Sequence, residues 1–169
     1  MRDLTEQLLA RTKVYFYVPS LEQLRRGGRI GAAASLWGTM FSIKPILAVE
    51  DGKVVPLEKV RSAAKAIARL QELVVADATG RPAGQARLAV HHFGNPAEAE
   101  QLAAKLAQAV PGCAPVQISA LPAVLAAHAG LGVLAVIVGE SSTPAAQDIP
   151  AAPEPGTEPR TPSGSPRSG

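Results

Sequence analysis

The chain has 169 residues, of which 47% are hydrophobic and 18% are charged, and its formal net charge is +3. This length and hydrophobic content suit one domain with a substantial core plus an appendage. The modest charge and the 4% aromatic content disfavour nucleic-acid binding, which relies on many cations and on rings that stack against bases. The single cysteine, Cys113, excludes an internal disulfide, and the longest apolar run, 131–138, is far shorter than the ~20 residues of a membrane-spanning helix. The first residues carry acids where a signal peptide would be apolar, so we expect a cytoplasmic protein.

The N-terminal part predicts a strand followed by a short helix. Residues 13–18 form the strand, and Ser20 with Gln23 has the spacing of a helix capping box. The helix must end at Gly27-Gly28, because glycine readily adopts the left-handed conformation that terminates helices. The stretch 31–38 consists largely of small residues, which allow another backbone or a ligand to approach closely.

A β-hairpin should follow. The apolar runs 43–49 and 53–57 are joined by Asp51-Gly52, a strong signal for a two-residue turn. Pro56 lacks the amide that a central strand needs, so the second run is expected at the edge of the sheet.

The remainder of the domain alternates helices with strands. Helix 61–78 carries apolar residues at helical spacing, and Asn95-Pro96 opens a second helix. Strands are predicted at 87–92, 116–120 and 131–138. The expected fold class is α/β: a mixed β-sheet with an inserted hairpin, covered by helices. Residues 1–140 would form this domain, and the Pro/Ser/Gly-rich residues 141–169 a disordered tail.

Two polar residues stand beside glycines in otherwise apolar surroundings. Arg29 lies in Gly27-Gly28-Arg29-Ile30-Gly31, and His128 precedes Gly130 and Gly132 in a predicted turn that leads into a strand. Such glycines expose backbone amides, and a guanidinium or an imidazole beside them can bind an anion. Taken alone, Arg29 could equally satisfy carbonyls at a helix end, and His128 could be a structural histidine.

The segments that carry these residues resemble the DegV family of bacterial fatty-acid-binding proteins. The resemblance rests on 14–30 (VYFYVPSLEQLRRGGRI), 43–47 (IKPIL), 50–54 (EDGKV), Val60-Arg61 and 128–132. It spans roughly residues 10–140 in order, and corresponds to the second half of a family member. The N-terminal α/β domain of the family is missing from this sequence, and Leu131 stands where family members usually have proline.

The resemblance implies a head-group site for a fatty-acid carboxylate. It would consist of Arg29 and His128 with Gly28, Gly130 and Gly132, and a guanidinium suits a carboxylate because its fork reaches both oxygens. No cofactor is expected. The resemblance also implies docking to a fatty acid kinase through Arg61, to which Lys65 is added as the next basic residue on the same helix face. A solvated surface remains an alternative for this basic face.

A fatty acid also needs an apolar channel, since each buried methylene contributes about 0.8 kcal/mol. The candidates for its wall are aliphatic or aromatic residues: Leu36, Met40, Phe41, Ile43, Ile46 and Leu125.

Other chemistry has little support in the sequence. The glycines after His128 lack the third glycine and the following helix of a dinucleotide fingerprint. His91 and His92 would point to opposite faces of a strand, so we expect no metal site. The serines show no nucleophile elbow.

Three hypotheses therefore remain. The first is a non-enzymatic fatty-acid carrier, truncated to one domain, that presents the carboxylate to a partner kinase. The second is an interaction module that completes its site with a separate N-terminal DegV domain or associates with itself. The third, an enzyme acting on a phosphorylated small molecule, lacks an identifiable base, nucleophile or metal set.

Overall fold

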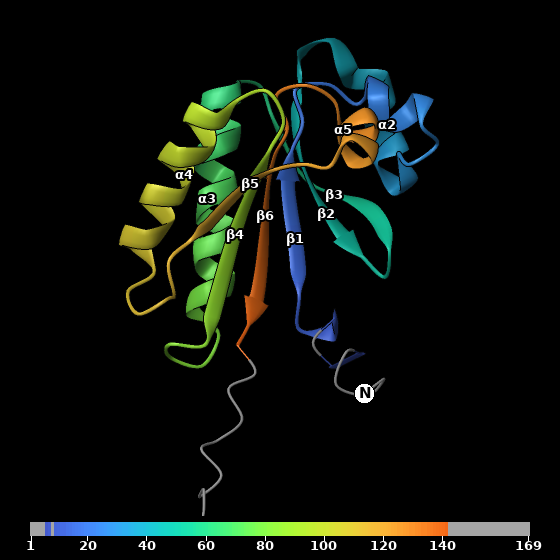
Figure 1. Ribbon diagram of the computed structural model, residues 1–169. Coiled ribbons are helices and arrows are strands. Elements are labelled where there is room, and N and C mark those ends of the chain that lie inside the picture. The colour runs from blue at the N-terminus through green and yellow to red at the C-terminus, as the bar shows by residue number, and fades with distance from the viewer. Residues whose placement is uncertain (1–5, 8, 142–169) are drawn as a thin grey trace, which may run out of the picture.

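The structure is a computed structural model that describes residues 6, 7 and 9–141, without the side chains of residues 37–42. Within that range six strands form one sheet, and helices lie on both of its faces (Figure 1). The predicted mixed α/β fold with an inserted hairpin is confirmed. In chain order the elements are β1 (Lys13–Tyr17), α2 (Glu22–Arg26), the 3-10 helix η1 (Gly31–Ser42), β2 (Lys44–Glu50), β3 (Lys53–Val60), α3 (Ala63–Thr79), β4 (Ala86–His92), α4 (Pro96–Ala109), β5 (Gln117–Ala120), α5 (Ala123–Ala129) and β6 (Leu134–Glu140).

The sheet has the strand order β3-β2-β1-β6-β4-β5. Neighbouring strands are antiparallel except β4 and β5, which are parallel. Asp51 and Gly52 form the predicted hairpin turn, and both have the positive φ (49° and 73°) that a tight turn between twisted strands requires. β3 lies at the edge of the sheet, as Pro56 predicts. The last strand, β6, inserts between β1 and β4, and thereby joins the two ends of the domain.

The two long helices, α3 and α4, cover one face of the sheet. α3 begins after Ser62, whose hydroxyl accepts a hydrogen bond from the amide of Lys65 (3.3 Å), as an N-cap does. Leu70 and Val74 of α3 and Leu106 of α4 are completely buried against the strands. The helical spacing of these apolar residues therefore identifies the face that packs on the sheet.

In the described part of the chain, α2, η1 and α5 lie on the opposite face. Figure 1 shows α2 and α5 side by side at one end of the sheet, the end at which β1 finishes and β6 begins. They and η1 contribute to a second core, whose buried members are Phe16, Val18, Leu21, Leu24, Ala33, Leu36, Leu47, Val133 and Ala135. No helix in the described part of the chain is long and apolar enough to span a bilayer.

The structure differs from the prediction around α5. Residues 123–129 form a helix where a turn was expected, because this stretch is rich in alanine, the strongest helix former. Gly130 ends the helix with a φ of 89°. β6 then begins at Leu134, three residues later than predicted, because Gly132 also has a positive φ (85°). β6 ends at Glu140, and the predicted tail 141–169 lies outside the described residues except for Ser141.

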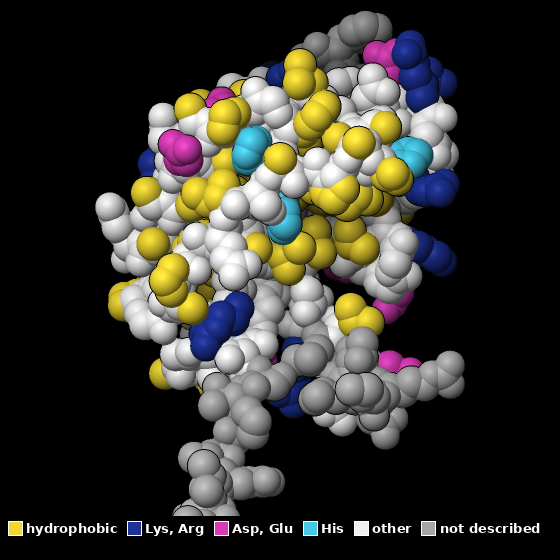
Figure 2. Space-filling view, in the orientation of Figure 1, with side chains coloured by type: hydrophobic (Ala, Val, Ile, Leu, Met, Phe, Trp, Pro, Cys, Tyr) yellow, Lys and Arg dark blue, Asp and Glu magenta, His cyan; other side chains and the backbone are white. Residues whose placement is uncertain are grey.

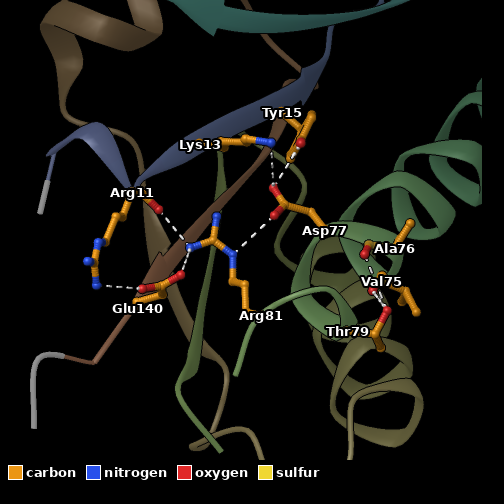
Figure 3. Close-up of polar contacts among 9 residues, drawn as sticks. All are labelled: Arg11, Lys13, Tyr15, Val75, Ala76, Asp77, Thr79, Arg81 and Glu140. Atoms are coloured by element: carbon orange, nitrogen blue, oxygen red, sulfur yellow. Dashed lines mark hydrogen bonds and ion pairs between the residues drawn. The ribbon is translucent and has the colours of Figure 1, made fainter. Parts of the chain in front are cut away.

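A polar cluster fastens the other end of the sheet (Figure 3). Arg81 Nε donates a hydrogen bond to Asp77 Oδ1 (3.1 Å), and Arg81 Nη1 donates to the carbonyl oxygen of Arg11 (2.7 Å) and lies 3.5 Å from Glu140 Oε1. The side chains of Arg81 and Asp77 are only 7% and 10% exposed. Tyr15 OH donates to Asp77 Oδ2 (2.8 Å), and burial together with this hydrogen bond raises the pKa of Tyr15 to about 12. The cluster ties the segment before β1 to the end of α3 and to the end of β6.

Candidate functional site

The loop that carries Arg29 is fixed by the way α2 ends. The amide of Gly28 donates to the carbonyl of Arg25 (3.0 Å), and the amide of Arg29 donates to the carbonyl of Leu24 (2.8 Å). These two bonds form a Schellman motif, in which Gly28 occupies the left-handed position with a φ of 67°. The predicted helix end is confirmed, and Arg29 follows it with a hydrogen-bonded backbone and an exposed side chain.

His128 lies in the last turn of α5, and its side chain is partly buried. α5 and α2 pack together, although about one hundred residues separate them in the chain. The structure thus brings His128 to the helix that precedes Arg29.

Gly27 is the point at which the two predicted anion-binding residues meet. A Cβ atom added to Gly27 would overlap His128 Nδ1 and lie 2.9 Å from His128 Cε1, so the imidazole rests directly against this glycine. Arg29 Nη1 donates a hydrogen bond to the carbonyl oxygen of the same glycine (3.3 Å). One residue therefore contacts both side chains, and we call Arg29, His128 and Gly27 the cationic mouth.

Two further glycines interlock the same loops. A Cβ on Gly130 would lie 3.0 Å from Gln23 Cγ, and one on Gly132 would lie 2.9 Å from Pro19 Cγ. Between these loops is a pocket of about 200 Å³, lined by Pro19, Ser20, Glu22, Gln23, Ala129, Gly130 and Leu131. A pocket of this size is smaller than typical small-molecule sites of ~300–1,000 Å³, so it is too small for a whole lipid, and neither Arg29 nor His128 lines it.

The capping box predicted at the start of α2 is not formed, because Leu21 is the N-cap and no side chain caps the helix. Ser20 Oγ accepts a hydrogen bond from the amide of Glu22 (3.2 Å), but Gln23 packs beneath Gly130 instead of completing the box. Ser20 and Gln23 therefore belong to the pocket wall, a role that the capping pattern concealed.

The predicted acyl-chain wall is not assembled as a single set. Leu36 is buried in the core beneath α2 and η1, and Ile43 packs against that core. Ile46 is buried in the opposite core, beneath α3, so it cannot line the same wall as Leu36. Leu125 is 53% exposed on α5. The side chains of Met40 and Phe41 lie outside the described part of the structure.

The basic face expected on one helix is divided in the structure. Arg61 precedes α3, Lys65 lies in its first turn, and both are exposed. The third basic residue of this face, Arg69, is occupied by an ion pair with Glu58 (2.8 Å) on β3 and by another with Glu72. Arg61 and Lys65 thus remain as the candidate docking residues.

The adjacent histidines His91 and His92 lie on β4, and His91 contacts the neighbouring strand β5. His91 Nδ1 lies 2.9 Å from Ser119 Oγ on β5, and burial, together with the nearby His92, lowers the pKa of His91. Among the described residues, no three or more His, Cys, Asp or Glu side chains come together as a metal site would require.

An exposed apolar surface, of the kind that the interaction-module hypothesis assumes, lies beside the cationic mouth. Val124, Leu125 and Leu131 are more than half exposed, and Phe93 is 38% exposed. Leu131 covers Gly94, the neighbour of Phe93, since a Cβ on that glycine would overlap the leucine side chain. Figure 2 shows hydrophobic side chains gathered on this face of the molecule. We call these four residues the α5 patch; the helix-forming composition of 123–129 was the sequence signal for it.

The sequence and the fold match those of known proteins. Residues 2–140 match the family described as "Uncharacterised protein, DegV family". A DegV domain-containing protein of Streptomyces coelicolor is 49% identical over 133 residues, which are 79% of this chain and 46% of that protein.

Two solved structures have the same fold at 30% sequence identity. One is a fatty acid binding DegV family protein of Streptococcus agalactiae (TM-score 0.74, covering 83% of this chain and 48% of that one). The other is a DegV family protein of Thermus thermophilus, also described by its fatty acid binding (TM-score 0.75, covering 83% and 49%). The chain thus spans about half the length of the relatives that it matches. On the extent of this match, which includes the strands, the helices and both loops of the cationic mouth, the chain belongs to the DegV family.

Proposed function

We propose that this domain is a non-enzymatic, cytoplasmic fatty-acid carrier, whose cationic mouth binds the carboxylate of a long-chain fatty acid. The observation that carries the proposal is the contact of both Arg29 and His128 with Gly27. Fatty acid binding by the relatives from Streptococcus agalactiae and Thermus thermophilus supports it.

The acyl chain and the carboxylate of a fatty acid need different surroundings in a binding site. Burial of a long acyl chain contributes on the order of 10 kcal/mol at about 0.8 kcal/mol per methylene, before the cost of ordering. A carboxylate resists removal from water unless it is paired and hydrogen-bonded. Arg29 can donate two parallel hydrogen bonds to it, and a ring N–H of His128 can donate a third. The amides of Gly28, Gly130 and Gly132 already donate to backbone carbonyls, so these glycines would contribute through the close approach of the loops that they allow.

We assign the acyl chain to the core between the sheet and the layer formed by α2 and η1. Leu36 and Ile43 belong to this core, and Met40 and Phe41 lie on the same 3-10 helix as Leu36. Leu125 would cover the entrance from α5. Entry of a chain requires this core to open, because Leu36 and its neighbours are closely packed.

Presentation of the carboxylate to a fatty acid kinase is part of the same proposal. Phosphoryl transfer would be performed by the kinase, and exposed Arg61 and Lys65 would contribute to its docking. Replacing both residues with glutamate should slow phosphorylation of the bound fatty acid by a purified fatty acid kinase, while lipid occupancy stays unchanged. Equal rates for the variant and the wild type would remove these residues from the proposal.

Native mass spectrometry of the protein purified from bacteria tests lipid binding directly. We expect co-purified fatty acid in the wild type and lower occupancy in Arg29→Ala. Arg26→Ala is the matched control, since Arg26 is equally exposed at the end of α2 but pairs with Glu22 of its own helix. Absence of lipid, together with no binding of a fluorescent fatty-acid analogue, would contradict the carrier function.

A second function is favoured by the α5 patch. Adjacent exposed apolar side chains are typical of interfaces, so the domain could complete its site with a separate N-terminal DegV domain, or associate with itself. Light scattering after size exclusion would then give a mass above that of one chain, and Val124→Ser with Leu131→Ser would restore the monomer. A monomer that captures no N-terminal DegV domain in a pull-down would exclude this function.

A further inference from the structure

We propose that Lys44 is a positioning residue for the cationic mouth: by holding the carbonyl of Pro19 it fixes the loop before α2 against the loop after α5. The inference rests on the proposed function for its consequence in binding. Its structural part stands on contacts that do not involve a ligand.

The first contact joins β2 to the loop between β1 and α2. Lys44 is the first residue of β2, and its Nζ donates a hydrogen bond to the carbonyl oxygen of Pro19 (3.0 Å) in a partly buried position. A lysine ammonium is strongly hydrated, so it leaves water only where another acceptor replaces the lost hydration. The Pro19 carbonyl, which no regular strand or helix occupies, provides that acceptor.

The second contact joins the same loop to the segment after α5. The Pro19 ring lies against Gly132, where an added Cβ would be 2.9 Å from Pro19 Cγ. In α2, the helix that follows this loop, Gln23 packs against Gly130 in the same manner. Lys44, Pro19 and Gly132 therefore form a continuous series of contacts from β2 to the backbone that follows His128.

The final step links this series to the mouth. Gly130 and Gly132 lie two and four residues after His128 in the chain. The position of this segment therefore influences where the His128 imidazole, which rests against Gly27, is held. If Pro19 moves away from Gly132, the end of α5 loses its support on this side. The His128 ring would then no longer be held beside the Arg29 loop, and the affinity for an anion would fall without loss of the fold.

A direct electrostatic role is the alternative that the experiment must separate. Lys44→Met removes a charge as well as a contact. Lys59→Met is the matched control. Lys59 is exposed on β3, opposite Pro45, the neighbour of Lys44. Its replacement removes the same charge from the same region but leaves the contact with Pro19 in place. Lys44→Arg keeps both the charge and a donor that can reach a carbonyl.

The test combines NMR of the ligand-free protein with displacement of a fluorescent fatty-acid analogue. In Lys44→Met we expect displaced resonances for the His128 ring and for the amides of Gly130 and Gly132, and about tenfold weaker binding, as for loss of one hydrogen bond to a charged group. Lys44→Arg should restore most of the affinity, and Lys59→Met should resemble the wild type in both measurements.

Two results would overturn the positioning role. One is weaker binding by Lys44→Met with unchanged His128 and glycine resonances, which would mean that Lys44 acts through its charge. The other is a wild-type spectrum and wild-type affinity in that variant. If the wild type itself binds no analogue, the proposed function fails, while the ligand-free resonances still decide whether Lys44 holds the two loops together.

Discussion

Replacement of Gly27 with alanine should weaken fatty-acid binding while the free energy of unfolding stays nearly unchanged. Gly27 has a φ of −78° and a ψ of −2°, a conformation that alanine adopts freely, so the backbone is not strained by the change. The new methyl group would overlap His128 Nδ1, and the nearest backbone atom beyond the ring is the carbonyl oxygen of Gln23 at 3.3 Å. The imidazole has to rotate away from the mouth, because it is the group with freedom to move.

The magnitudes follow from these contacts. A compatible Gly→Ala change stabilises a protein by about 0.4–1 kcal/mol through the unfolded chain, and a displaced rotamer costs about 0.5–1.5 kcal/mol. We therefore expect the free energy of unfolding to change by less than about 1 kcal/mol. A lost hydrogen bond from His128 to a carboxylate is worth about 1.5–3 kcal/mol, which corresponds to roughly 10–100-fold weaker binding of a fatty acid.

Displacement of a fluorescent fatty-acid analogue measures the affinity, and urea denaturation measures the stability. Gly52→Ala is the reverse control: Gly52 has a φ of 73° and no neighbour within 4 Å, so alanine should cost about 1–2 kcal/mol of stability without affecting binding. Wild-type affinity in Gly27→Ala would refute the reasoning, since it would show that the position of His128 against Gly27 does not matter to the ligand.

Three further predictions concern the mouth and the polar cluster. Arg29→Lys keeps the charge but loses the planar fork, so affinity should fall about tenfold with no change in melting temperature; equal affinities would show that only the charge matters. The pKa of Tyr15 is raised to about 12 from 10.0, so its stabilising contribution is complete below pH 10 and is lost as the pH rises through about 12; denaturation across this range should show a loss that Tyr15→Phe lacks, and identical profiles would contradict it. Arg81→Met leaves the nearly buried Asp77 without its main partner and should cost about 3 kcal/mol in urea denaturation, whereas Arg69→Met, at an exposed ion pair, should leave the stability nearly unchanged; similar losses would refute the role of burial.

The local elements of this protein can be assigned from short stretches of its sequence. Asp51-Gly52 specified the hairpin because few residues other than glycine and Asp or Asn tolerate a positive φ, and Gly27-Gly28 specified the end of α2 for the same reason. The spacing of Leu70 and Val74 identified the buried face of α3. Helical and turn geometries depend on neighbouring residues, so a short stretch of sequence contains the information that they need.

The face of the sheet that each residue of a continuous apolar run occupies depends on long-range packing. Ile46 and Leu47 are both completely buried, but in opposite cores, and a strand buried on both faces shows no alternation from which their sides could be assigned. The cationic mouth likewise depends on contacts between residues that are distant in the sequence. β6 pairs with β1 across more than one hundred residues, and this long-range pairing, not any local pattern, brings His128 to Gly27 and Arg29.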